Sequence, residues 1–120
     1  MAIDPVLGDY LISIEHWCGN AVEATDGLTA DQFLSVKLRQ MALSMCVVQI
    51  GEASGRILRK WPEFASINPQ IELAKAHAMR HRIVHGYEQS DMMTLWFTVS
   101  VSIPVMRAEV YKLLIEHGVE

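Results

Sequence analysis

The sequence predicts an all-α protein, an antiparallel four-helix bundle formed by a single domain over residues 1–120. Apolar residues recur at steps of three and four along most of the chain, which is the spacing of one helix face. No stretch alternates apolar and polar residues as a half-buried strand does, and the sequence has no internal repeat. Turn signals leave mostly short connections, which is typical of a bundle.

The first helix is predicted over about residues 4–25. Asp4 precedes Pro5, and proline is accepted at the first helical position because an N–H there would have no helical partner. Gly27 marks the end of the helix. The predicted apolar face consists of Leu7, Tyr10, Leu11, Ile14, Cys18, Ala21 and Val22.

The second helix is predicted to be long and to end near Lys60. Thr29 and Gln32 have the spacing of a capping box at its start. Residues 61–69 contain two prolines and no sustained period, so they are expected to form a loop. The predicted apolar face of the helix consists of Leu38, Met41, Ala42, Met45, Val48 and Ile57.

Two further helices complete the predicted bundle. The third is expected from Ile71 to about Val84 and to stop near Gly86, because glycine suits the left-handed residue that ends many helices. The fourth is expected to begin at a cap on Ser90 or Asp91 and to run nearly to the C-terminus. Pro104 falls inside it, and we expect a kink there because proline lacks a backbone donor and clashes with the preceding turn.

The charge distribution argues against a general nucleic-acid coat but allows a local electropositive site. The formal net charge is −4 at pH 7. Residues 37–82 nevertheless contain eight of the ten Lys and Arg residues and three acidic residues, whereas residues 1–36 contain six acidic residues and no Lys or Arg. A local positive potential attracts phosphates even on an acidic protein.

Hydrophobic residues make up 51% of the chain, which is more than a polar monomer needs, so we expect a buried subunit interface. The uncharged stretch 92–106 contains Thr, Ser and Pro, and it is shorter than the ~20 residues of a membrane-spanning helix. The N-terminus lacks the basic start and apolar run of a secretory signal. We therefore expect a cytoplasmic protein with no membrane partner.

Cysteine and tryptophan positions indicate packing. Cys18 and Cys46 lie in apolar helical patterns without a CxxC pairing, so buried thiols are expected. Trp17, Trp61 and Trp96 are expected in the core or at an interface, with base-stacking platforms as the alternative.

Residues 80–87 read Arg-His-Arg-Ile-Val-His-Gly-Tyr and lie at a predicted helix end. The guanidinium of Arg80 is a permanent cation whose planar fork matches a phosphate. The imidazole of His85 is suited to proton transfer near neutral pH, and Tyr87 offers a hydroxyl that can be modified. The segment therefore points to chemistry on a phosphodiester.

His77, His81 and His85 are spaced by four, and such a stripe can bind zinc. The absence of an adjacent carboxylate or cysteine at ligand spacing weakens this interpretation. The alternative is a solvated polar helix face with one capping histidine. We expect neither a metal nor another cofactor.

Cleavage of RNA without a metal needs a base for the 2′-hydroxyl, an acid for the leaving 5′-oxygen and a cation for the charge on the phosphorane. One arginine and one histidine do not fill all these roles. Arg80 and His85 are also five residues apart, about 140° around an ideal helix. Two copies facing each other in a symmetric homodimer would supply two arginines and two histidines to one cleft.

The segment resembles the signature of the HepT-like toxins, a family of the HEPN superfamily of small helical ribonucleases. The resemblance covers residues 6–116. It rests on Arg80, the polar residue His81, His85 and Tyr87, together with Ile50 to Ala53, Met79, Asp91 to Trp96 and Pro104.

The resemblance implies the toxin of a toxin–antitoxin pair, a homodimer that cleaves RNA without a metal and is encoded beside a minimal nucleotidyltransferase antitoxin. It implies that Arg80 holds or stabilises the phosphate and that His85 acts as general acid or base. His81 stands where the family commonly has asparagine, so it is a supporting candidate. Tyr87 matches the tyrosine that the antitoxin adenylylates, and AMP there would add bulk and negative charge where an RNA phosphate binds.

Three more residues are candidates. Glu52 is expected to order Arg80 or to contact a partner, with a local packing role as the alternative. Arg82 and Lys75 are expected to steer RNA, unless they are simply solvated. Two other functions stay open: a non-catalytic regulatory or partner subunit of a nucleotidyltransferase, and a metal-binding helical protein that uses the three histidines.

Overall fold

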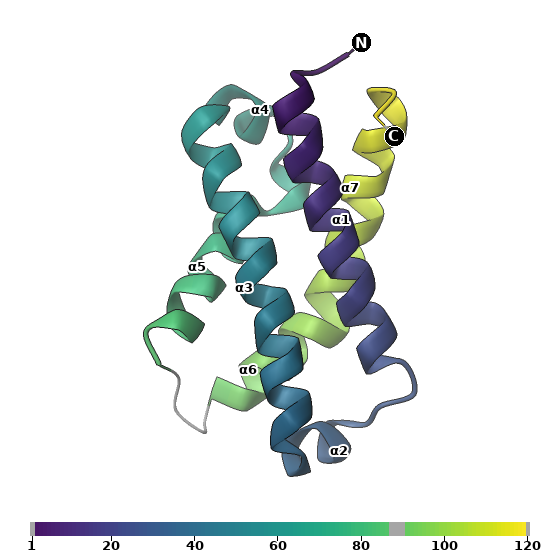
Figure 1. The fold of residues 1–120 in the computed structure, drawn as a ribbon, viewed down its shortest axis with the longest axis vertical. Helices are drawn as coiled ribbons and strands as arrows, with labels where there is room; N and C mark the ends of the chain where they lie inside the picture. The colour runs from purple at the N-terminus through teal and green to yellow at the C-terminus, as the bar shows by residue number, and fades with distance from the viewer. Residues whose placement is uncertain (1, 87–90, 120) are drawn as a thin grey trace.

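The computed structural model describes residues 2–86 and 91–119, without the side chain of Asp91, and within these ranges it contains helices and no strand. The elements are α1 (Pro5–Thr25), α2 (Ala30–Ser35), α3 (Lys37–Lys60), α4 (Pro62–Ile67), η1 (Pro69–Ile71), α5 (Leu73–Val84), α6 (Asp91–Phe97), η2 (Thr98–Ser102) and α7 (Ile103–Glu116). The helices α1, α3, α5 and α7 alternate in direction along the long axis (Figure 1). The predicted all-α antiparallel bundle is confirmed.

The local signals at the start of the chain are confirmed. The carboxylate of Asp4 accepts a hydrogen bond from the Val6 N–H at 2.8 Å and caps α1. Gly27 follows the helix with φ +71°. The capping box of α2 is complete, because the Gln32 N–H donates to the Thr29 hydroxyl at 3.2 Å and the Thr29 N–H donates to the Gln32 side chain at 2.9 Å.

The prediction of one continuous second helix is wrong. Val36 has φ −124° and ψ 105°, an extended conformation that separates α2 from α3. The break exposes carbonyl groups that a continuous helix would have paired. The Gln40 side chain donates to two of them, the carbonyls of Phe33 and Leu34, at 3.2 and 3.1 Å. A side chain four residues beyond the break therefore stabilises it.

The prediction of a loop over residues 61–69 is also wrong. The helices α4 and η1 lie there, and each begins at a proline, whose fixed φ suits the first helical position. The next helix, α5, starts at Leu73 because Glu72 has a left-handed φ of 50°. At the other end of α5, Gly86 has φ +84°, as the sequence predicts.

The last predicted helix bends between α6 and α7 (Figure 1). The bend contains the π-helical segment η2, and Pro104 lies in the first turn of α7. The hydroxyls of Thr98 and Ser100 donate to carbonyls one turn earlier, at 2.8 and 2.6 Å, a contact that often bends helices. The kink near Pro104 is confirmed. Ser90 and the side chain of Asp91, the expected caps, lie outside the described residues.

Most buried core residues belong to α1, α3 and α7, and the three tryptophans pack against the core while partly buried. The rings of Phe33 and Trp96 lie 5.3 Å apart.

Cys18 and Cys46 are buried free thiols, and burial raises the pKa of Cys18 to about 12. Within the described ranges, none of the helices has the length and apolar character needed to cross a bilayer.

Candidate active site

Two glycines of α3 allow α5 to approach it closely. A Cβ on Gly51 would collide with the Cβ of Arg80 and would lie 2.8 Å from the carbonyl oxygen of Ala76. A Cβ on Gly55 would lie 2.5 Å from Nδ1 of His77. Both glycines are buried, and they stand one helical turn apart. The glycine spacing therefore sets the distance between the two helices and the position of Arg80.

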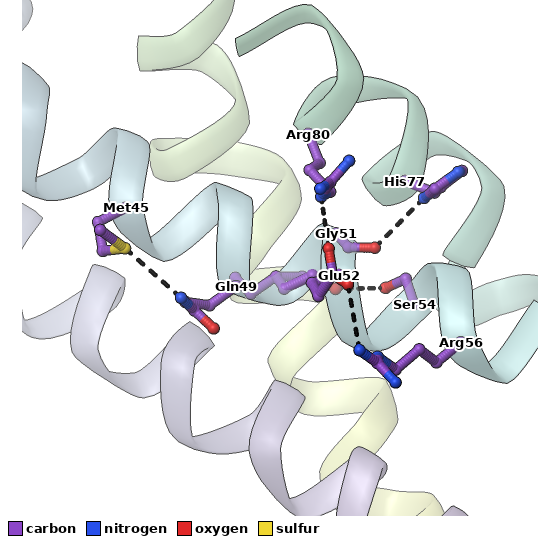
Figure 2. A network of polar contacts seen from close by, with 9 residues as sticks. Met45, Gln49, Gly51, Glu52, Ser54, Arg56, His77 and Arg80 are labelled. Carbon is purple, nitrogen blue, oxygen red and sulfur yellow. Dashed lines mark hydrogen bonds and ion pairs between the residues drawn. The ribbon is translucent and has the colours of Figure 1, made fainter. Parts of the chain in front are cut away.

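Glu52 of α3 holds the Arg80 guanidinium. Its Oε2 lies 2.7 Å from Nε of Arg80, and its Oε1 lies 3.6 Å from Nη2 of Arg56 (Figure 2). Nε of Arg80 is fully buried, and its N–H lacks the alignment of a hydrogen bond. The contact is a close ion pair, because 2.7 Å is well within ion-pair range. Glu52 orders Arg80 in the structure, as one interpretation of the sequence expected.

His81, in the last turn of α5, and His85, which directly follows the helix, lie side by side. Their ring centres are 4.1 Å apart with the planes inclined by 44°, and both residues are exposed. The His85 N–H donates to the His81 carbonyl at 3.1 Å, which closes the helix end. Within one protomer, Arg80 therefore faces α3 while the two imidazoles form an exposed pair.

The third histidine does not join this pair. Nδ1 of His77 lies 3.4 Å from the carbonyl oxygen of Gly51, so His77 points toward α3 (Figure 2). No group of three His, Cys, Asp or Glu side chains suited to a metal occurs among the described residues. The three histidines therefore do not act as one stripe, because α5 packs its His77 side against α3.

Lys75 and Arg82 lie on another flank of α5. Both line a groove of about 540 Å³ between α5 and the segment from α6 to α7, and its wall is largely apolar. Nζ of Lys75 is 3.6 Å from a carboxylate oxygen of Glu72. The groove does not include Arg80, His81 or His85. The structure therefore does not bring these two candidate RNA contacts together with the other candidates in one protomer.

Tyr87, the predicted modification site, lies outside the described residues. It follows Gly86, whose positive φ ends the helix directly after His85.

Most of the apolar face predicted for the second helix is exposed, Ala42 included, so this prediction is wrong except at Ile57. The apolar residues that α3 buries are Leu43, Cys46, Val47, Ile50, Ala53 and Ile57. Leu38, Met41 and Met45 are exposed by 73%, 58% and 51%, because they point away from the core residues of α3. Met45, Gln49 and Glu52 follow one another along α3, and the Gln49 amide donates to the Met45 sulfur at 3.6 Å (Figure 2). This α3 stripe, Leu38 to Met45, thus continues toward the Glu52–Arg80 pair.

Two contributors were missed in the sequence. Gly55 gives His77 its space, and Arg56 shares the Glu52 carboxylate with Arg80. The sequence does contain a signal for the role of Gly55, because Gly51 and Gly55 form a small-residue pair four positions apart, a spacing that allows close helix packing. The signal for the Arg56 contact is the four-residue step from Glu52 to Arg56, which makes the two side chains neighbours on the helix.

Comparison with known proteins gives a consistent set of similarities. A family model described as "Ribonuclease HepT-like" matches residues 14–113. A probable ribonuclease HepT of Thermococcus cleftensis is 31% identical over 105 residues, which cover 88% of this chain and 93% of that protein. A putative RNase of Methanocaldococcus jannaschii is 25% identical over 105 residues, which cover 88% of this chain and 84% of that protein. No solved structure matches the chain.

Proposed function

The chain belongs to the HepT-like ribonuclease family, and we propose that it is a metal-independent endoribonuclease whose active site combines Arg80 and His85 from two subunits. We further propose that it is the toxin of a toxin–antitoxin pair and acts in the cytoplasm. The observation that carries the nuclease assignment is the position of Arg80. Glu52 of α3 holds its guanidinium, and Arg80 lies on α5, the helix that His85 directly follows.

The proposed reaction needs only proton transfer and charge stabilisation. A base removes the 2′-hydroxyl proton, and the 2′-oxygen attacks the adjacent phosphorus. An acid protonates the 5′-oxygen as the phosphorus–oxygen bond breaks, which leaves a 2′,3′-cyclic phosphate and a 5′-hydroxyl. In each site the two imidazoles of one subunit, those of His85 and its neighbour His81, fill the two proton-transfer roles, and the guanidinium of the partner subunit's Arg80 stabilises the phosphorane.

Arg80 is suited to the phosphate role because Glu52 holds it through Nε. No described acceptor is paired with its two terminal nitrogens, which are the atoms that bind phosphate oxygens in a fork. The carboxylate of Glu52 is in turn shared with Arg56, so the cluster of two arginines and one glutamate carries a net positive charge. Glu52 is therefore a positioning residue in the proposed site.

A homodimer completes the site. In one protomer Arg80 faces α3 and His85 lies in the exposed pair at the helix end, so a second copy is needed to place an arginine opposite the imidazoles. The α3 stripe supports this arrangement, because exposed apolar residues beside a charged site are typical of an interface. We propose that the stripe packs against its counterpart in the partner subunit.

A nucleotidyltransferase antitoxin is proposed to inactivate the enzyme by adenylylating Tyr87. The reaction joins the tyrosine oxygen to the α-phosphorus of ATP and releases pyrophosphate. Tyr87 is two residues from His85, so the attached AMP would place negative charge where the RNA phosphate must bind. Incubation with ATP and the antitoxin should add one AMP to the wild type and none to Tyr87→Phe, and RNA cleavage should fall in the wild type alone.

The nuclease is tested by cleavage of purified RNA in EDTA. The wild type should release fragments with 2′,3′-cyclic phosphate ends, while His85→Ala should lose activity by at least about a hundredfold, the usual loss for a missing acid or base. His16→Ala is the matched control, because His16 is an exposed histidine on α1. Equal cleavage by His85→Ala and the wild type would remove His85 from catalysis. An inactive wild type that still accepts AMP at Tyr87 would favour the non-catalytic partner subunit.

A further inference from the structure

The exposed pair of imidazoles at the end of α5 has the geometry of a small chelating site. His81 and His85 stand four residues apart on one helical turn, and their ring centres lie 4.1 Å apart. The hydrogen bonds His85 N–H to His81 carbonyl, at 3.1 Å, and Gly86 N–H to Ile83 carbonyl, at 3.3 Å, fix the backbone of this turn. The positions from which the two side chains start are therefore fixed before any ligand binds.

We propose that His81 and His85 bind a divalent transition metal such as Zn²⁺, and that the bound metal inhibits the ribonuclease. Two histidines at this spacing on one helix face are an established way to hold zinc. The metal-binding part of the proposal depends only on the pair. The inhibition rests on the proposed function, in which His85 transfers a proton.

The distance between the rings agrees with this use. Two nitrogens bound at about 2.1 Å with a tetrahedral angle lie about 3.4 Å apart, which places the ring centres about 5 Å apart. The pair must open by about 1 Å from its separation of 4.1 Å to bind zinc in this way. Both residues are exposed, so rotation of their side chains meets no packed neighbour of the core.

The site lies at the carboxyl end of α5, where the helix dipole favours a cation. His77 is turned toward the Gly51 carbonyl, and the described residues offer no third ligand. The remaining positions on the metal are therefore left for water or for the imidazole pair of a second subunit. Zinc would bind with one ion per chain in the first case and one ion per two chains in the second.

Bound metal would stop proton transfer by His85. A nitrogen that donates its lone pair to zinc accepts no proton from a 2′-hydroxyl and delivers none to a 5′-oxygen. An enzyme that needs no metal would thus be inhibited by one, with zinc and the RNA phosphate competing for the same end of α5.

The test is a calorimetric titration of the metal-free protein with zinc sulfate. The wild type should bind zinc, and His81→Ala and His85→Ala should each bind at least about tenfold more weakly, because loss of a direct ligand costs no less than loss of a group that supports one. His16→Ala should bind as the wild type does. Absence of binding to the wild type at high micromolar zinc, or equal binding by His81→Ala, would overturn the proposed site.

Inhibition is measured separately as cleavage of RNA at increasing zinc. Wild-type activity should fall over the same zinc range in which calorimetry shows binding, and the residual activity of His81→Ala should need about tenfold more zinc for the same fractional loss. Zinc that binds the pair without reducing cleavage would overturn the inhibitory role. Zinc binding by a wild type that never cleaves RNA would overturn the nuclease proposal while leaving the metal site intact.

Discussion

Replacing Gly51 by alanine should separate α3 from α5 and displace Arg80. The added Cβ would collide with the Cβ of Arg80 and lie 2.8 Å from the Ala76 carbonyl oxygen. Neither group is the flexible end of a side chain, so a helix has to move. Alanine gains about 1 kcal/mol of helix propensity over glycine, while overpacking costs about 1–3 kcal/mol. The net change in the free energy of unfolding is therefore a loss of up to about 2 kcal/mol.

Gly19→Ala is the matched control. It lies within α1, and its Cβ would approach only the Arg107 guanidinium, with the nearest atom at 3.3 Å. This side chain end can move, so the propensity gain of up to about 1 kcal/mol should remain.

The melting temperatures of Gly51→Ala and Gly19→Ala should shift in opposite directions relative to the wild type. For a domain of this size about 1 kcal/mol corresponds to roughly 4 °C, so Gly51→Ala should melt up to about 8 °C lower than the wild type, whereas Gly19→Ala should melt slightly higher. RNA cleavage should fall in Gly51→Ala at temperatures where it is fully folded. A Gly51→Ala protein as stable and as active as Gly19→Ala would refute the idea that glycine sets the distance between α3 and α5.

Three other changes test separate parts of the structure. Glu52→Gln keeps the side-chain size but removes the charge that holds Arg80. RNA cleavage should fall at least about tenfold, while the free energy of unfolding changes by less than about 1 kcal/mol because the ion pair is partly exposed. Unchanged cleavage would show that Glu52 does not position Arg80. Met45→Glu should shift the dimer toward monomer in analytical ultracentrifugation. Ile67→Glu should not, because Ile67 is an exposed apolar residue on α4, away from the α3 stripe. Equal dimer stability in the two variants would show that the α3 stripe is not part of the interface. The Cys18 thiol has its pKa raised from 9.0 to about 12, so between these values it is protonated when folded and ionised when unfolded. Stability should therefore fall as pH rises through this window by up to about 1.4 kcal/mol per pH unit, and Cys18→Ala should show a shallower fall in urea titrations; identical slopes would argue against the raised pKa.

Much of the fold could be predicted because its signals are local. The Asp4 cap and the capping box at Thr29 each involve residues two or three positions apart. The end of α5 at Gly86 needs only the left-handed conformation of one glycine. Such features do not depend on the rest of the chain, so sequence reasoning finds them.

The errors arose where the apolar period of the sequence does not decide the structure. The break at Val36 depends on Gln40 reaching back to two carbonyls, and no local period shows it. Leu38, Met41 and Met45 fit an apolar helix face, yet they are exposed, since periodicity cannot tell a core face from a face that awaits a partner.

The candidate site was predictable as a set of residue types and less so as an arrangement. The spacing of Arg80 and His85 already indicated that they do not share a face. That Glu52 holds Arg80 follows from the packing of α5 on α3, whereas the pairing of His81 with His85 follows from their four-residue spacing. The two glycines of α3 allow α5 to approach closely and so determine this packing, which a helical wheel of α5 alone does not show.

The central proposal is an active site that combines Arg80 of one subunit with His85 of the other, and it is tested most directly by mixing two inactive variants. Arg80→Ala and His85→Ala are each assayed for RNA cleavage in EDTA beside the wild type, and are then unfolded together and refolded to exchange subunits. Random pairing gives heterodimers for half of the molecules, each with one intact composite site, so the mixture should recover about a quarter of the wild-type activity. A mixture that stays as inactive as its two components, with heterodimers present by mass spectrometry, would contradict the composite site.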